Sequence, residues 1–137
     1  MAQLQDLEVG QVVAERELAF TRETLVRYAG ASGDFNPIHY RDDVAEAVGL
    51  PGVLAHGMLT MGAAVQPVVD WAGPGRVLDY QVRFTRPVVV DPEAGAALRV
   101  VATVGKVEEG TARIDLTVTA GEQTVLGKAQ VVVATDR

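Results

Sequence analysis

Two kinds of hydrophobic periodicity divide the chain near residue 75. Between Gly57 and Trp71 apolar residues recur at steps of three and four, which predicts a helix with one broad apolar face. Beyond Gly73-Pro74-Gly75 the period changes to two, in segments rich in Val and Thr. The predicted strands cover residues 77–84, 97–107, 112–119 and 124–134, with hairpin turns at 109–110 and 120–122.

The first half of the chain contains shorter elements. A strand is expected over residues 11–20, and Thr21 is a suitable N-cap for a helix that ends near Gly30. A second short helix is expected to start at Asp42-Asp43 and to stop at Gly49. Helices therefore precede most of the strands, which favours an α+β fold over alternating βαβ units.

The apolar helix carries a proline in its second half. Because Pro67 has no N–H to donate, we expect a kink or an early end near Gln66. The strands of the second half, together with the first strand, would form a curved antiparallel sheet wrapped around this helix.

Composition narrows the class of protein without identifying it. At 137 residues, with 48% hydrophobic and 22% charged residues, the chain is expected to form one domain. The absence of cysteine excludes disulfides, thiolate nucleophiles and the common zinc sites. A net charge of −6 argues against nucleic-acid binding, and no segment is apolar enough to cross a membrane, so a cytoplasmic location is expected.

The segment Gly33-Asp34-Phe35-Asn36-Pro37-Ile38-His39 places a carboxylate and an imidazole on one rigid turn. Pro37 fixes its own φ and moves Asn36 out of the helical region, so Asp34 and His39 cannot lie along one helix. Such a pair can share the protons of one water molecule. The alternative for this motif alone is a capping Asp followed by a solvated loop His.

The second histidine of the chain, His56, precedes the predicted start of the apolar helix at Gly57. An N–H group at a helix start carries partial positive charge, and glycine allows a ligand to approach closely, so Gly57 is a candidate oxyanion site. The alternative is that Gly57 only eases entry into a buried helix. We expect His56 to be a structural histidine, whose replacement by Gln affects folding more than chemistry.

Residues 33–39, together with Ala55-His56-Gly57-Met58, resemble the hydratase motif of the MaoC-like, (R)-specific enoyl-thioester hydratases, which have the hot-dog fold. The opening Val9-Gly10-Gln11 and residues 82–88 are also similar to segments of that family. Within it, the small actinobacterial β-hydroxyacyl-ACP dehydratase subunits are most similar. The resemblance implies a single hot-dog domain over residues 1–137, and at this length we expect no fused double hot dog.

The resemblance also implies a reaction, the reversible hydration of a trans-2-enoyl thioester to the (3R)-3-hydroxyacyl thioester in fatty-acid metabolism. Asp34 and His39 would be the catalytic residues, Gly57 would bind the thioester oxygen, and Asn36 and His56 would support the site. No cofactor and no metal ion would be needed.

Partners are implied in the same way. The substrate would be an acyl-CoA or acyl carrier protein thioester, and the chain would form a homodimer or a heterodimer with a related hot-dog subunit. An acidic carrier protein would need a basic patch, for which Arg76, Arg83, Arg86 and Lys106 are candidates. Two alternatives stay open: a hot-dog thioesterase, and a non-catalytic acyl-binding partner subunit.

Overall fold

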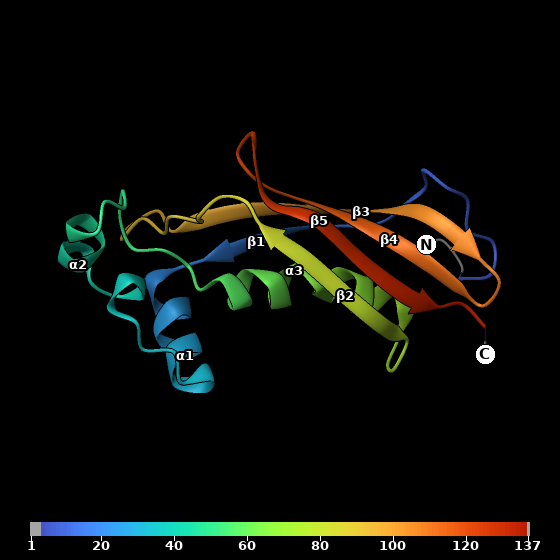
Figure 1. The fold of residues 1–137 in the computed structure, drawn as a ribbon, viewed down its shortest axis with the longest axis horizontal. Coiled ribbons are helices and arrows are strands. Elements are labelled where there is room, and N and C mark those ends of the chain that lie inside the picture. Colours follow the sequence, from blue (N-terminus) through green and yellow to red (C-terminus); the bar gives the residue numbers. More distant parts are fainter. Residues whose placement is uncertain (1–3, 137) are drawn as a thin grey trace.

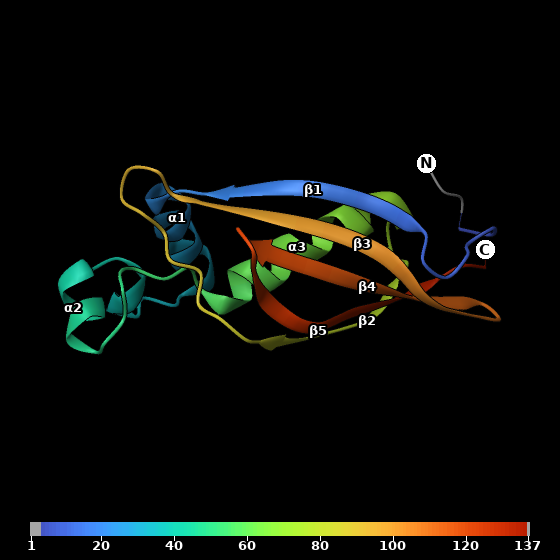
Figure 2. The same ribbon diagram turned by 90° about the horizontal axis from the view of Figure 1, so that it is seen from above.

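In the computed structural model, which describes residues 4–136, five antiparallel strands form one sheet in the order β1-β3-β4-β5-β2. The strands are β1 (Val12–Phe20), β2 (Val77–Phe84), β3 (Ala96–Glu108), β4 (Thr111–Ala120) and β5 (Gln123–Ala134). Figure 2 shows this order across the sheet. β1 and β2 are therefore the edge strands.

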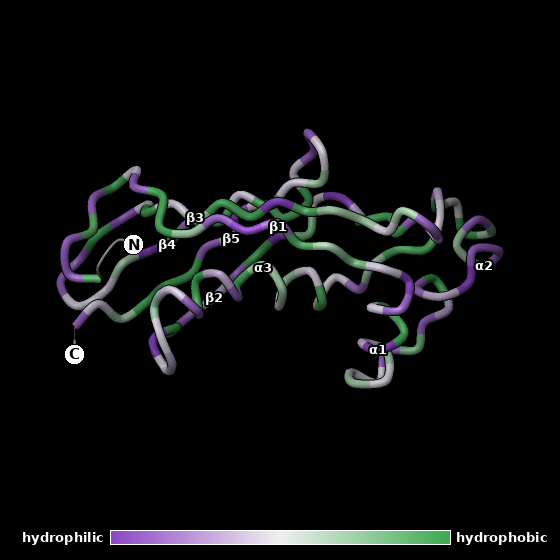
Figure 3. The backbone as a smooth tube through the Cα atoms, turned by 180° about the vertical axis from the view of Figure 1, so that it is seen from behind, coloured by the Kyte–Doolittle hydropathy of each residue, from purple (hydrophilic) through white to green (hydrophobic). Residues whose placement is uncertain are grey.

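The core lies between this sheet and helix α3 (Gly57–Ala72), which follows one face of it (Figures 1 and 2). Every second residue of β4 from Ala112 to Val118 is buried, as expected for a strand with one covered face. The helix contributes buried Ala64, Val65 and Val68 to the same cluster. Figure 3 shows α3 mostly in white and green, so sheet and helix bury apolar surface against each other.

The remaining helical elements gather at one end of the sheet, away from the β3–β4 hairpin (Figure 1). They are α1 (Arg22–Ser32), the 3₁₀ turn η1 (Pro37–His39) and α2 (Asp42–Ala47). Helix α1 starts at a capping box in which the Thr24 N–H donates to Thr21 Oγ1 and the Thr21 N–H donates to Thr24 Oγ1. Because α3 begins at this end, the predicted site residues converge here.

The predicted fold class is confirmed: one curved antiparallel sheet covers a central helix, as the hot-dog fold requires. Each predicted strand lies within one residue of the observed one at either end. The predicted end of α1 near Gly30 is wrong by two residues. Gly30 is part of the helix, and the left-handed conformation that ends it is adopted by Gly33, with φ of 78°.

The expected early end of α3 near Gln66 is also wrong, because one helix runs through Pro67 to Ala72. The Pro67 ring is buried in the core, and two carbonyls of the preceding turn gain side-chain donors. Tyr80 Oη donates to the Met61 carbonyl at 2.7 Å, and Gln66 Nε2 donates to the Gly62 carbonyl at 3.2 Å. Burial raises the pKa of Tyr80 to about 12, so this hydroxyl stays a donor. The carbonyl that loses its helical donor is that of Ala63, four residues before Pro67, and the packing of the buried proline ring offsets this loss.

Among the helices of residues 4–136, none is both long and apolar enough to cross a bilayer.

Candidate active site

The Asn-Pro turn fixes the Asp34 carboxylate through local hydrogen bonds. The Asn36 N–H donates to Asp34 Oδ1 at 3.1 Å, and the Ile38 N–H donates to Asn36 Oδ1 at 3.2 Å. This second bond caps the 3₁₀ turn that carries His39. Asp34 and His39 are thus set on two ends of one short, hydrogen-bonded turn, and Asn36 lies between them as a loop-orienting residue.

His39 is buried and its orientation is fixed by the segment that precedes α3. Its Nδ1 lies 2.7 Å from the Leu54 carbonyl, which can only accept, so Nδ1 carries the proton. Nε2 is then the ring atom with a lone pair in the neutral form. It lies 3.9 Å from Asp34 Oδ2, and the Asp34 side chain is 51% exposed. This distance is too long for a direct hydrogen bond, and it allows one water molecule to donate to both atoms.

His56 lies directly behind this pair and contacts both members. Its ring stacks on the His39 ring with centroids 3.9 Å apart, and Nε2 lies 3.2 Å from the Asp34 carbonyl oxygen. Tyr28 of α1 packs edge-on against His56, with ring centroids 4.7 Å apart. The Asp34 carbonyl requires a donor, so Nε2 carries the proton of the neutral ring.

The other nitrogen of this ring, His56 Nδ1, is buried and has no hydrogen-bond partner in the described part of the chain. A proton there would be unsatisfied and would place a charge beside His39. Burial, followed by the charge of His39, lowers the pKa of His56 below its ordinary value of 6.5, against an opposing effect of Asp34. The surroundings of His56 therefore favour its neutral form, and its ring packs directly against the pair.

Gly57 is the first residue of α3, as predicted, and the helix has no side-chain N-cap at His56. Its N–H has no acceptor within the helix, so it is free to bind a ligand oxygen. The Phe84 ring, at the end of β2, packs over this glycine: an added Cβ would lie 3.1 Å from Phe84 Cε1. A side chain at position 57 would therefore press on this ring and require it to shift, a contact that sequence reasoning did not find.

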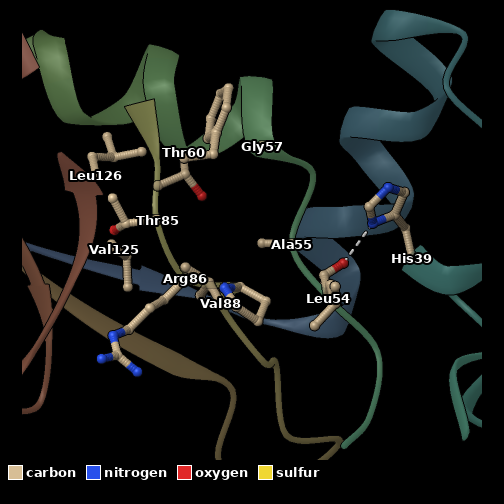
Figure 4. Close-up of a pocket in the computed structure, with 12 residues that line it drawn as sticks. His39, Leu54, Ala55, Gly57, Thr60, Thr85, Arg86, Val88, Val125 and Leu126 are labelled. Carbon is tan, nitrogen blue, oxygen red and sulfur yellow. Dashed lines mark hydrogen bonds between the residues drawn. The ribbon is translucent and has the colours of Figure 1, made fainter. Parts of the chain in front are cut away.

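A cavity of about 290 Å³ opens beside these groups (Figure 4). His39 and Gly57 line it, with Phe84, Thr60 and Arg86 among the other lining residues. Figure 4 shows His39 on one side of the cavity and the guanidinium of Arg86 directed away from it on the other. Most of the wall between them is apolar, which suits an acyl thioester more than a polar metabolite.

Donor atoms of Asp34, His39 and His56 lie within 4.8 Å of one another, so a metal ion must be considered. The two imidazole rings are stacked, with planes 22° apart, and His56 Nε2 already contacts the Asp34 carbonyl. Lone pairs in stacked planes do not converge on one ion. The donor geometry favours an acid–base pair over a metal centre.

Two of the cations considered for a basic patch are engaged elsewhere. Arg76 donates to the carbonyls of Ala134 and Asp136, and Lys106 forms an ion pair with Glu108.

The fold and this site together define a hot-dog protein with a carboxylate–imidazole pair beside the first turn of its central helix. The family model described as "MaoC like domain" matches residues 5–125. The chain belongs to the MaoC-like family.

Similar proteins are consistent with this family assignment. The 3-hydroxyacyl-thioester dehydratase X of Mycobacterium tuberculosis is 42% identical over 78 residues, which cover 57% of this chain and 27% of that protein. A solved MaoC-like dehydratase superposes with a TM-score of 0.92 at 33% identity, over 96% of this chain and 42% of that one. R-hydratase PhaJ1 from Pseudomonas aeruginosa superposes with a TM-score of 0.80 at 29% identity, and the match covers 96% of this chain and 84% of that one. The chain thus spans about a quarter of that mycobacterial relative.

Proposed function

We propose that this protein catalyses the reversible hydration of a trans-2-enoyl thioester to the (3R)-3-hydroxyacyl thioester. The observation that carries this proposal is the 3.9 Å separation of His39 Nε2 and Asp34 Oδ2 beside a largely apolar cavity. Two similar proteins, a 3-hydroxyacyl-thioester dehydratase and an R-hydratase, support the same reaction class.

In the hydration direction, a single water molecule donates two hydrogen bonds, one to Asp34 and one to His39. Its oxygen bonds to the β-carbon while one of the pair takes the proton that is released. The α-carbon receives a proton from the same pair, and the double bond is lost. In dehydration the roles reverse, and the 3-hydroxyl leaves as water.

The electrons of the double bond move toward the thioester carbonyl as the carbon–oxygen bond forms. We assign the stabilisation of that oxygen to the Gly57 N–H, aided by the positive end of the α3 dipole. The oxygen would lie about 3 Å from the Gly57 nitrogen. The β-carbon, two bonds beyond the carbonyl, would then face Asp34 and His39.

The proposal is tested by mixing the purified protein with crotonyl-CoA while recording the enoyl-thioester absorbance and free thiol. Hydration removes the absorbance and releases no thiol. Release of CoA thiol would make the protein a thioesterase. If neither signal changes at protein concentrations sufficient for single turnover, the protein is a non-catalytic acyl-binding subunit and the proposal is contradicted.

We propose that His56 holds the pair in place while remaining neutral, and this leads to a pH prediction. Because the pKa of His56 is lowered in the folded state, the unfolded chain binds more protons just below the ordinary value of 6.5. The stability contributed by neutral His56 is present above pH 6.5 and is lost as the pH falls from 6.5 through the lowered pKa of the folded state. We expect the urea midpoint to decrease between about pH 7 and pH 5.5.

The His56→Gln variant is the control for this measurement. It should be less stable than the wild type at about pH 7, because a packed ring and its bond to Asp34 are lost, and its midpoint should depend less on pH over the same range. An equal decrease in both proteins would show that another group is responsible.

We further propose that the chain assembles with a second hot-dog subunit, identical or related. Edge strand β2 exposes Leu78 and Phe84, and Met58 is exposed on the neighbouring first turn of α3, with 58%, 56% and 60% of their areas accessible. Exposed strand edges and exposed large apolar side chains favour association. Light scattering at assay concentration should give a dimer or a larger assembly, and an active monomer would contradict this.

A further inference from the structure

Thr60 is a buried polar residue whose hydroxyl the protein itself does not use. The residue is 3% exposed and lies at the end of the first turn of α3, where it lines the cavity. Within residues 4–136 the hydroxyl has no hydrogen-bond partner. Figure 4 shows its oxygen directed into the cavity, toward the side on which Ala55 and His39 lie. A ligand that displaces water from this space must therefore offer the hydroxyl a partner atom.

The helix cannot readily satisfy this hydroxyl. A threonine within a helix usually donates to the carbonyl four residues earlier, which here is that of His56. That oxygen already accepts the Leu59 N–H at 3.1 Å and the Thr60 N–H at 3.2 Å, so both of its lone pairs are engaged. The other threonine of the cavity wall differs, because the Thr85 hydroxyl donates to the Thr124 carbonyl at 3.0 Å. Of the two hydroxyls, the one at Thr60 is thus available to a ligand.

The position of Thr60 on α3 indicates which ligand atom it can reach. Residues three apart lie on the same face of a helix, and side chains tilt toward the helix N-terminus. Thr60 therefore projects toward the turn that begins at Gly57, and glycine has no side chain to fill the space between. The Gly57 N–H, which has no acceptor within the helix, and the Thr60 hydroxyl both belong to residues that line this cavity.

Resting on the proposed function, we propose that the Thr60 hydroxyl donates a second hydrogen bond to the thioester oxygen, beside that of the Gly57 N–H. Negative charge grows on this oxygen as water bonds to the β-carbon, so a donor fixed in advance stabilises the transition state more than the bound substrate. The chemistry recognised is that of a developing enolate oxygen. Thr60 is by this assignment a catalytic residue, because its hydroxyl contacts the reacting group.

The kinetic test compares two substitutions that separate the hydroxyl from the shape of the side chain. Thr60→Val removes only the O–H group, and kcat for crotonyl-CoA hydration should decrease about tenfold or more with little change in KM. Thr60→Ser keeps the hydroxyl and should retain most of the activity. Thr117→Val is the control for the same exchange at an exposed position of β4, and its kinetics should equal those of the wild type.

A spectroscopic measurement decides whether the hydroxyl contacts the oxygen. Butyryl-CoA with an isotope-labelled carbonyl has no double bond to hydrate, and hydrogen bonds to its oxygen lower the carbonyl stretching frequency in infrared difference spectra. Binding to the wild type and to Thr60→Ser should lower this frequency by the same amount. Binding to Thr60→Val should lower it less.

An equal frequency in the wild type and Thr60→Val, or the absence of any decrease in the wild type, would overturn the inference. The same holds for a loss of turnover in Thr60→Val without a change in frequency, because the role would then be structural. The infrared measurement requires no turnover. Wild-type activity on crotonyl-CoA therefore tests the proposed reaction separately from the role of Thr60.

Discussion

Replacing Asp34 with Asn, or His39 with Gln, is expected to lower kcat for enoyl-thioester hydration by about 10²-fold or more, the scale of positioned acid–base catalysis. Both substitutions preserve the local structure. An Asn side chain still accepts the Asn36 N–H, and a Gln side chain still offers a donor toward the Leu54 carbonyl. Each variant therefore loses the proton-transferring atom while the turn is retained, and circular dichroism should be unchanged.

Asp70→Asn is the matched control for the carboxylate. Asp70 lies near the other end of α3, its side chain is 60% exposed against 51% for Asp34, and it forms a surface ion pair with Arg16. Loss of that pair should change stability by less than about 1 kcal/mol and leave turnover unaffected. Near-normal turnover in folded Asp34→Asn and His39→Gln proteins would remove both residues from the mechanism.

The second large effect is expected at Gly57. A side chain there blocks the approach of the thioester oxygen to the first N–H of α3, so Gly57→Val should lower kcat/KM by about 10²- to 10³-fold, as loss of an oxyanion donor does elsewhere. The cause is contact and not backbone strain, because φ of Gly57 lies outside the left-handed region. Steady-state kinetics with crotonyl-CoA measure the effect.

Phe84 complicates this experiment, because the new Cβ would also press against its ring at 3.1 Å. Combining Gly57→Val with Phe84→Leu relieves that contact and leaves the N–H blocked. The double variant should remain impaired relative to Phe84→Leu alone. Gly62→Ala is the matched control on the same helix, because nothing lies within 4 Å of its added Cβ, and it should be tolerated. Recovery of activity in the double variant would refute the oxyanion role.

The strands of the sheet could be predicted because their information is local. Residues 111–120 alternate between the core and the outer side, and turns at Gly110 and Gly121 have positive φ, so pattern and turn chemistry agree. The course of α3 through Pro67 could not be predicted in this way. It depends on the packing of the buried proline ring against the rest of the core, which is a tertiary effect.

The same distinction between local and tertiary information applies to the candidate site. Asp34 and His39 are five residues apart on one turn, so the sequence alone predicts their proximity. The contacts that orient them come from distant segments: the Leu54 carbonyl, the stacked ring of His56 and the edge of Tyr28. Phe84 reaches Gly57 only because β2 ends beside the start of α3. Such contacts leave no periodic signal in the sequence.

The cations illustrate why a charge count could not locate a binding surface. Arg76 and Lys106 were as plausible as Arg83 and Arg86 while their neighbours were unknown. The fold places Arg76 against carbonyls near the end of β5 and pairs Lys106 with Glu108, which leaves the cations beside the cavity available.

The measurement that tests the proposed reaction most directly is chiral analysis of the product formed from crotonyl-CoA. Hydration by Asp34 and His39 on the face of the double bond presented by the cavity should give (3R)-3-hydroxybutyryl-CoA, and the wild type should also regenerate crotonyl-CoA from that isomer. Asp34→Asn, at equal concentration, should do both far more slowly. Formation of the (3S) isomer, or of free crotonate and CoA, would contradict the account.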